Sequence, residues 1–344
     1  MTYAIFFGGS SYEHEISIVS AIVLKDIIID RCEFVFIDQE RELYLIDAKD
    51  MKSTYFSSFA YKKAPKLRFK KGGLESEKKL FSKTVEFDVA INLIHGRDGE
   101  DGKLASLFEF YDIDALTPSL EASAISYNKL LTKQYANIRG VKTLPFEIVK
   151  RGESIKSIEY PLILKPLRLG SSIGVSIIKS KDELEYGLDV AFEFDSDVLI
   201  EPFVEGIKEY NLSGFSSKGE FIFSKVEEVK KEAYLDFDKK YCDFSRSSVV
   251  DESGVDEGLK SSLREAFEAL YTDMFEGAMI RCDFFVQDKE VFINEINPIP
   301  GSLANYLYED FNTALKKASN SLKECRDIKI DYLYINKIKN AKGK

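Results

Sequence analysis

Three side chains that carry oxygen, Asp283, Glu295 and Asn297, interrupt two otherwise apolar runs in the segment AMIRCDFFVQDKEVFINEINPIPG, residues 278–301. The aromatic and branched residues of these runs, with polar QDKE between them, predict two antiparallel strands joined by a tight turn. Carboxylate and amide oxygens suit Mg²⁺, which keeps several waters and often takes further ligands from substrate phosphates. The segment is therefore a candidate magnesium site.

The length of the turn decides whether these side chains meet, because residues that face each other across an antiparallel pair point to the same side of the sheet. An odd number of turn residues sets Asp283 opposite Glu295 and Arg281 opposite Asn297. A turn of two residues would put the two carboxylates on opposite faces and remove the site. A surface hairpin with solvated charges is the alternative, but the matching parity of the polar positions favours the metal site.

Two glycine loops in the N-terminal third follow predicted strands and precede predicted helices. The strand, loop and helix are expected at 3–7, 8–11 and 16–29, and again at 87–94, 95–102 and 103–111. This repeated layout predicts an α/β domain whose loops line one cleft. Taken alone, the first loop is equally consistent with an ordinary tight turn, and the second would more simply be a solvated surface turn. Glu13, just before the first helix, could stabilise the helix dipole or hold a substrate ammonium group.

The middle of the chain carries candidate groups for a polyanion. Small residues at 167–175 follow Lys165, and consecutive backbone N–H groups there can form an anion-binding nest. An unliganded hairpin turn is the alternative. The extended segment that begins at Glu201 could present backbone groups to the edge of an adenine ring. In the helix predicted over 121–137, Lys129 and Lys133 are solvated charges by base rate.

Length, charge and cysteine usage limit the class of protein. The 344 residues predict two or three domains. The net charge of −10 disfavours binding to nucleic acid or to anionic membranes. The four cysteines form no CxxC pair, the N-terminus shows no export signal, and no apolar run reaches the roughly 18 residues that span a bilayer. We expect a cytoplasmic protein.

Six blocks, in this order, resemble the bacterial D-alanine–D-alanine ligases of the ATP-grasp superfamily across nearly the whole chain. They are GGSSYEHEIS (8–17), HGRDGEDG (95–102), KPLRLGSSIGVS (165–176), DKKYCDF (238–244), IRCDFF (280–285) and NEINPIPG (294–301). The resemblance implies an α/β, three-domain ATP-grasp architecture. An N-terminal parallel-sheet domain would span 1–118, a central domain 119–206 and a C-terminal domain 207–344, with ATP between the last two.

The resemblance also implies the reaction and its partners. ATP would phosphorylate the carboxylate of one D-alanine, and the amine of a second D-alanine would attack the acyl phosphate to give the dipeptide of peptidoglycan precursors. Two Mg²⁺ or Mn²⁺ ions would neutralise the phosphates. Members of the family suggest a homodimer. Residues 228–250 show no clear period, which is typical of a functional lid or a disordered segment, and a closed lid would keep water from the acyl phosphate.

Matching residue by residue carries the roles of the family onto this sequence. The implied metal ligands are Asp283, Glu295 and Asn297, and the implied ATP-binding residues are Lys129, Lys165, Glu201, Val204 and Glu209. The catalytic set is Glu13 for the ammonium of the first D-alanine, Arg281 and the Gly301 N–H for the oxyanion, and Ser171 and Tyr241 for orienting the substrates. Further substrate-binding positions are His95, Lys240, Tyr306 and Leu307.

Two positions depart from the pattern of the family. Tyr306 stands where most members carry a serine that contacts the second substrate, and Pro298 replaces a common threonine. Of the roles carried over from the family, acceptor binding is therefore the one that the residues of this sequence support least. An ATP-grasp ligase with a different acceptor is the first alternative. A silent nucleotide-binding module has no need for Asp283, Glu295, Asn297 and Arg281 together. A nicotinamide-dependent oxidoreductase would be expected to carry a three-glycine fingerprint, which is missing.

Overall fold

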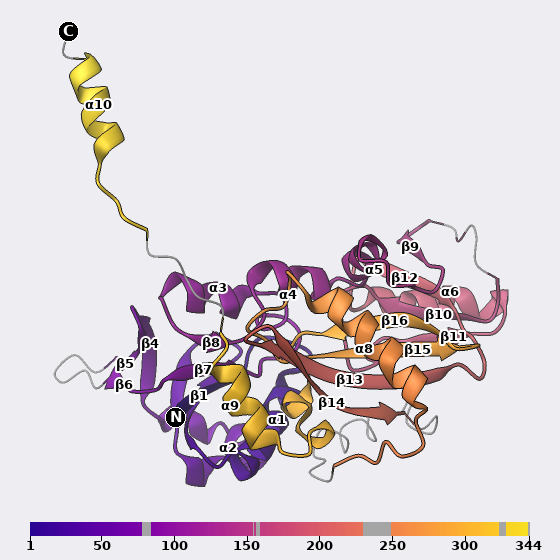
Figure 1. Ribbon diagram of the computed structural model, residues 1–344, viewed down its shortest axis with the longest axis horizontal. Helices are drawn as coiled ribbons and strands as arrows, with labels where there is room; N and C mark the ends of the chain where they lie inside the picture. Colours follow the sequence, from indigo (N-terminus) through magenta and orange to yellow (C-terminus); the bar gives the residue numbers. More distant parts are fainter. Residues whose placement is uncertain (78–83, 154, 156–158, 230–248, 323–327, 343–344) are drawn as a thin grey trace.

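The computed structural model contains three β-sheets that follow one another along the chain (Figure 1). It describes residues 1–344 except 78–83, 154, 156–158, 230–248, 323–327 and 343–344. Each sheet lies within one of the three predicted domain ranges, although the domain boundaries themselves stay a prediction. Within the part of the chain that the structure describes, no helix is both long and apolar enough to cross a bilayer.

The first sheet is mixed, with strand order β6-β5-β4-β3-β2-β1-β7-β8. Its parallel half consists of β1 (Thr2–Gly8), β2 (Arg31–Ile37), β7 (Val89–Asn92) and β8 (Ala115–Leu116). Four antiparallel strands extend it: β3 (Leu43–Ile46), β4 (Lys66–Lys70), β5 (Gly73–Ser76) and β6 (Thr84–Val85). The expectation of a parallel sheet is therefore correct for one half only, because the lysine-rich stretch after residue 40 showed no clear strand period.

Two helices of this domain, those that follow the glycine loops, were predicted, and three short helical segments between residues 48 and 63 were not. The segments are α1 (His14–Ile27), η1 (Ala48–Asp50), α2 (Ser53–Ser57), η2 (Ala60–Lys63) and α3 (Lys103–Phe110). The two glycine loops meet beyond β1 and β7, where the backbone N–H of Ser10 donates to Asp98 at 3.1 Å. Ser17 of α1 joins the two strands, since its hydroxyl accepts from Gly8 N–H and donates to the Leu93 carbonyl.

The single helix predicted over 121–137 is two helices, α4 (Leu120–Tyr127) and α5 (Lys129–Ile138). Asn128 separates them, because its backbone is extended and its side chain accepts from the N–H groups of Leu130 and Leu131. A side-chain cap of this kind satisfies N–H groups that have no partner within the helix. The break directs α5 so that Lys129 and Lys133 lie over the second and third sheets.

The second and third sheets are antiparallel. The second has order β11-β10-β12-β9, with β9 (Glu147–Lys150), β10 (Leu162–Pro166), β11 (Ser176–Ile178), β12 (Asp197–Pro202) and the covering helix α6 (Lys181–Phe192). The third has order β14-β13-β15-β16, with β13 (Lys208–Ser217), β14 (Glu220–Glu228), β15 (Ile280–Gln287), β16 (Glu290–Asn297) and α8 (Glu257–Tyr271). Behind the third sheet, the aromatic side chains of Phe267 and Tyr271 are fully buried.

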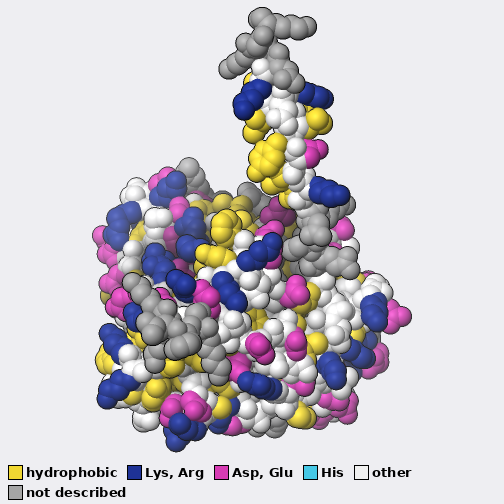
Figure 2. Space-filling view, turned by 90° about the vertical axis from the view of Figure 1, so that its left-hand side faces the viewer, with side chains coloured by type: hydrophobic (Ala, Val, Ile, Leu, Met, Phe, Trp, Pro, Cys, Tyr) yellow, Lys and Arg dark blue, Asp and Glu magenta, His cyan; other side chains and the backbone are white. Residues whose placement is uncertain are grey.

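The chain ends with η4 (Gly301–Leu307), α9 (Phe311–Ser319) and α10 (Leu333–Lys342). Figure 1 shows α10 standing away from the sheets, and Figure 2 shows lysine and hydrophobic side chains on the surface of this projection. Tyr334, Ile335 and Ile338 are exposed there.

Candidate active site

The hairpin of β15 and β16 brings the candidate metal ligands together by a route that the sequence did not reveal. The turn consists of two residues, Asp288 and Lys289, with φ of 50° and 69°, so the expected odd number is wrong. Near the turn Phe284 faces Ile293, but farther along Asp283 faces Glu295. Asn294 is therefore an extra residue in β16, a β-bulge that shifts the register by one.

The bulge restores the pairing that the two-residue turn alone would have lost. Asp283 lies opposite Glu295 and Arg281 opposite Asn297, as predicted. Both oxygens of Asp283 accept from Arg281, at 2.7 Å from Nε and 2.8 Å from Nη2. Asn297 Nδ2 donates to the same carboxylate at 2.9 Å. The face thus holds two carboxylates, an amide and a guanidinium.

Burial dominates the electrostatics of this face. It raises the pKa of Asp283, although Arg281 and the Asn297 amide favour the charged carboxylate. For Arg281, burial lowers the pKa, but the nearby Asp283 outweighs it and raises the pKa well above its usual value. Hard oxygen donors grouped in this way fit Mg²⁺ or Mn²⁺. The described residues contain no group of three or more His, Cys, Asp or Glu side chains arranged to hold a metal ion.

A second charged cluster joins α5, β10 and β12. The two oxygens of Glu201 each accept from a different lysine: Lys133 Nζ lies 2.5 Å from Oε1, and Lys165 Nζ lies 2.8 Å from Oε2. Burial raises the pKa of Glu201, but the two ammonium groups together outweigh it and bring the pKa to about 2. Lys165 also donates to Asn294 Oδ1 at 3.0 Å and lies over the ring of Phe285.

The remaining predicted ATP-binding residues surround this cluster. Lys129, the first residue of α5, donates to the Leu169 carbonyl at 2.7 Å and lies 3.5 Å from Glu295, so it connects the small-residue loop with the metal hairpin. Glu209, near the start of β13, is among the charges that raise the pKa of Lys165 against burial. Val204 lies in the turn between β12 and β13, where its carbonyl accepts from Ile207.

Glu13 is the buried carboxylate of the first substrate loop. Its side chain is 3% exposed, and Ser171 donates to Oε1 at 2.5 Å across the domain boundary. Among the described residues, no hydrogen-bond partner reaches Glu13 Oε2. Burial raises the pKa of Glu13, with smaller opposing effects from Ser171 and Lys129. A buried carboxylate with one open oxygen is suited to a cationic ligand.

His95 and Arg281 meet on the side of the site toward β7. The imidazole of His95 is buried, and Nδ1 donates to the Leu93 carbonyl at 2.8 Å. Burial lowers the pKa of His95 to about 4, and the charge of Arg281 acts in the same direction. His95 is therefore neutral at physiological pH and can share a pocket with the guanidinium without repelling it.

The segment after β16 is tightly bent. Gly301 begins η4, and the next three residues, Ser302, Leu303 and Ala304, all have left-handed backbone angles with φ of 48°, 51° and 52°. Such angles are strained for residues with a side chain and require support. Part of this support is the Ser302 N–H, which donates to Ser20 of α1 at 3.1 Å. The turn buries Tyr306 and Leu307, and Tyr306 lies close enough to influence Arg281 electrostatically.

Fifteen of the seventeen predicted site residues are described by the structure, and they lie in or beside the three sheets. The other two, Lys240 and Tyr241, lie in 230–248, outside the described residues, and so does most of the predicted lid. Two family models match this chain, one over its N-terminal part and one over most of the rest. Residues 2–116 match the model described as the N-terminus of D-ala D-ala ligase, and residues 122–314 match the model of its C-terminus. The chain belongs to the D-alanine–D-alanine ligase family.

Relatives of similar length agree with this assignment. The chain is 56% identical to the D-alanine–D-alanine ligase of Nitratiruptor sp. over 99% of this chain and 100% of that protein. It is 56% identical to that of Wolinella succinogenes over the full length of both. The crystal structure of the Helicobacter pylori D-alanine–D-alanine ligase is 45% identical, covers 95% of this chain and 100% of its own, and superimposes with a TM-score of 0.85. The predicted α/β ATP-grasp fold is confirmed.

Three charged or polar residues near the site of this D-alanine–D-alanine ligase family member were missed in the sequence. Lys133 was interpreted as a solvated helix charge, yet its side chain is 1% exposed. Its position four residues after Lys129, on the same helix face, was the available signal. Glu100 is influenced by Glu13, and burial raises its pKa well above the usual value. Asn294 gave no signal, because nothing in the sequence marked the bulge.

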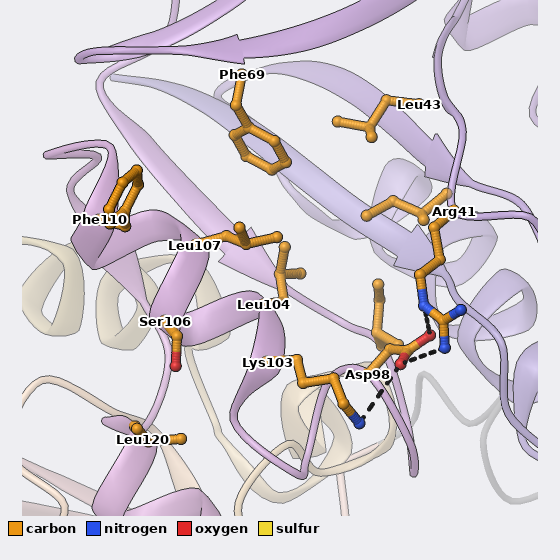
Figure 3. A pocket seen from close by; sticks show the side chains of 12 residues that line it. Arg41, Leu43, Phe69, Asp98, Lys103, Leu104, Ser106, Leu107, Phe110 and Leu120 are labelled. Atoms are coloured by element: carbon orange, nitrogen blue, oxygen red, sulfur yellow. Dashed lines mark hydrogen bonds and ion pairs between the residues drawn. The ribbon is translucent and has the colours of Figure 1, made fainter.

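A cavity of about 530 Å³ lies apart from this site, between α3 and the first sheet (Figure 3). Apolar side chains such as Phe69, Leu104 and Leu107 line it, and Arg41 and Lys103 form ion pairs with Asp98 at one end. None of the predicted site residues that the structure describes lines it. One of its lining residues, Asp98, also accepts from the Ser10 N–H in the first glycine loop.

Proposed function

We propose that this protein joins two D-alanines into D-alanyl-D-alanine, with ATP converted to ADP and phosphate and an acyl phosphate as the intermediate. The observation that carries the proposal is the buried Glu13 carboxylate: Ser171 donates to Oε1, Lys129 and Glu295 act on it electrostatically, and Oε2 has no hydrogen-bond partner among the described residues. An ammonium group there would supply the missing cation. The carboxylate of the same D-alanine would then point toward the phosphates and the metal face.

The roles of the other residues follow from chemistry and position. A carboxylate is a poor electrophile, and phosphorylation turns one of its oxygens into a leaving group. Lys129 and Lys165 adjoin the small-residue loop and would bind the phosphates of ATP. Glu201, Val204 and Glu209, along the passage from β12 to β13, would hold adenine and ribose. When the second amine attacks, Arg281 and the Gly301 N–H would stabilise the oxyanion of the tetrahedral intermediate.

Asp283, Glu295 and Asn297 would hold two Mg²⁺ or Mn²⁺ ions together with the phosphates of ATP. Bound there, the ions would neutralise the phosphates and the charge that develops during transfer. In the unliganded arrangement Asp283 is paired with Arg281 through both oxygens, so metal binding would compete with this ion pair. Arg281 would thereby be free to turn toward the substrate once the site is loaded.

A different acceptor is the second candidate, and Tyr306 is the observation that favours it. This buried phenol occupies the position where most family members have a serine, beside Arg281. Lys240 and Tyr241, through the predicted lid, would bind the second carboxylate and orient the substrates, with His95 and the Leu307 backbone as further contacts. We also propose that the protein is a cytoplasmic homodimer with domains at 1–118, 119–206 and 207–344.

The test is phosphate release from ATP and Mg²⁺ with D-alanine, compared with L-alanine and with D-alanine plus D-lactate, the products being identified by mass. Release with D-alanine alone and formation of the dipeptide are expected. ATP binding without a response to D-alanine would contradict the substrate assignment and direct attention to Tyr306. Release only with another carboxylate and amine pair would favour the second candidate.

A further inference from the structure

We propose that Lys133 is a positioning residue that keeps the Glu201 carboxylate in place for the adenine ring after ATP has drawn Lys165 away. The inference rests on the proposed function, in which Glu201 recognises adenine and Lys165 binds phosphate. It concerns a lysine to which the family resemblance gave no role. Its basis is the different surroundings of the two lysines that share Glu201.

Lys133 and Lys165 bind opposite oxygens of one carboxylate, and among the described residues Lys165 has a further side-chain hydrogen bond beside the small-residue loop while none is found for Lys133. Lys165 Nζ donates to Asn294 at 3.0 Å as well as to Glu201 at 2.8 Å, and it lies two residues before the small-residue loop. Glu295 and Glu209 also act on it electrostatically. A lysine with several weakly competing partners can move to a triphosphate, because the phosphate charges attract it more strongly than an amide does.

Lys133 has no comparable freedom. Its side chain is 1% exposed, its ammonium group lies 2.5 Å from Glu201 Oε1, and the ring of Phe146 lies 5.4 Å from Nζ. Burial lowers the pKa of Lys133, and the nearby Glu201 opposes this shift. The Lys133 ammonium group is thus enclosed beside Glu201 Oε1, where a ligand cannot reach it without disrupting the core.

This asymmetry gives each lysine a separate task. In the unliganded protein Glu201 has two counter-ions, one more than a single carboxylate requires. When the phosphates recruit Lys165, Lys133 remains and orients Glu201, so that its second oxygen becomes available to accept from the 6-amino group of adenine. Without Lys133, the departure of Lys165 would leave the Glu201 carboxylate buried with no cation. An unpaired buried charge is costly, and the contact that fixes the orientation of this carboxylate would be lost.

Binding of ATP and of inosine triphosphate distinguishes this role from simple structural support, because inosine lacks the 6-amino group. Dissociation constants are measured by calorimetry for the wild type, Lys133→Met and Lys142→Met, without D-alanine, and kcat is measured separately. Lys142, an exposed lysine paired with Glu290 at the surface, is the matched control. We expect Lys133→Met to weaken ATP binding about 10- to 100-fold, with a much smaller effect on inosine triphosphate and on kcat.

The Lys133→Gln variant keeps a hydrogen-bond donor and replaces Lys133→Met if the latter does not fold, with the same expected loss of preference for ATP. A folded variant that keeps the wild-type ratio of the two dissociation constants would overturn the inference, as would an equal loss for both nucleotides. Because binding is measured without D-alanine, the test does not depend on the amino acid substrate. A wild type that binds ATP but does not ligate D-alanine contradicts only the proposed function.

Discussion

Glu13 and Glu201 are both buried, at 3% and 1% exposed, yet their surroundings move their pKa values in opposite directions. Each oxygen of Glu201 has its own lysine, and the pKa is about 2. Glu13 has a serine hydroxyl on one oxygen and no partner among the described residues on the other, and burial raises its pKa. Burial is common to both, and the neighbouring cations make the difference.

The comparison shows which part of the site is complete within the protein and which part requires a ligand. At Glu201 the cations come from the fold, so the carboxylate is charged and held before any ligand arrives. At Glu13 no described residue forms an ion pair with the carboxylate, although Lys129 acts on it electrostatically, and the ammonium of a substrate would supply a direct partner. Changes at the complete cluster should therefore affect nucleotide binding and stability, whereas changes at the open face should affect the amino acid substrate and turnover.

The largest effect is expected at the candidate metal site, where no other described side chain takes the place of the Asp283 or Glu295 carboxylate. Asp283→Asn or Glu295→Gln should lower turnover by more than about 100-fold, because each removes a charged ligand. The folded structure should persist, as measured by circular dichroism, because an amide side chain at position 283 can still accept hydrogen bonds from Arg281 and Asn297. Turnover near the wild-type value in either variant would contradict the assignment of these ligands.

Arg281→Ala should have the next largest effect. Loss of a group that stabilises the oxyanion lowers kcat by roughly 100-fold or more, while the dissociation constant of ATP should change little. The variant also removes the bidentate partner of Asp283, so metal affinity should be measured beside it. A pure loss of ATP binding at unchanged kcat would place Arg281 with the Glu201 cluster instead.

Glu13→Gln tests the open side of the comparison. We expect the KM for D-alanine to rise by about 10- to 100-fold, the usual worth of a hydrogen bond to a charged group, with unchanged binding of ATP.

A raised pKa of Glu13 in the folded state means that the native protein holds the proton more tightly than the unfolded chain. Stability from Glu13 is therefore lost as the pH rises above the ordinary carboxyl range toward the raised value.

Thermal unfolding of this variant gives an independent measurement of the same property. At pH 7 to 8 Glu13→Gln should melt at or above the wild-type temperature, because it no longer buries an ionised carboxylate without a cation. Near pH 4 the difference should shrink, since the wild-type carboxyl is then protonated. A melting temperature well below that of the wild type at neutral pH would show that Glu13 is already paired.

The smallest effect is expected from crowding Glu13 without changing its charge. A Cβ at Gly96 would lie 2.6 Å from Glu13 Oε2 and 2.4 Å from Ser11 Oγ, at a φ of +66°. Gly140 has a similar φ of +75° with nothing within 4 Å, so Gly140→Ala controls for backbone strain alone. Gly96→Ala should raise the KM for D-alanine several-fold more than Gly140→Ala, at comparable losses of stability. Equal KM values would show that Oε2 does not face the substrate.

Much of the site was predictable because its residues belong to short segments with strong local patterns. The two glycine loops, the loop after Lys165 and the metal hairpin each lie between apolar runs, and local periodicity identified their elements and parity. The resemblance then assigned roles to the residues. The pairing of Asp283 with Glu295 was predicted correctly, although for the wrong reason, since the turn holds two residues and the bulge at Asn294 corrects the register.

The sequence by itself determined the α/β class, the strand-loop-helix units at the glycine loops and the identity of the candidate ligands, because these follow from composition, spacing and short motifs. Only the tertiary structure decided which charges are neutralised. Lys133 looks like any surface lysine until α5 places it against β12, 68 residues later in the chain, at Glu201. Glu13 Oε1 accepts from a serine 158 residues later in the chain, while Oε2 has no hydrogen-bond partner among the described residues. Pairing between distant segments depends on packing, and a local pattern carries no information about it.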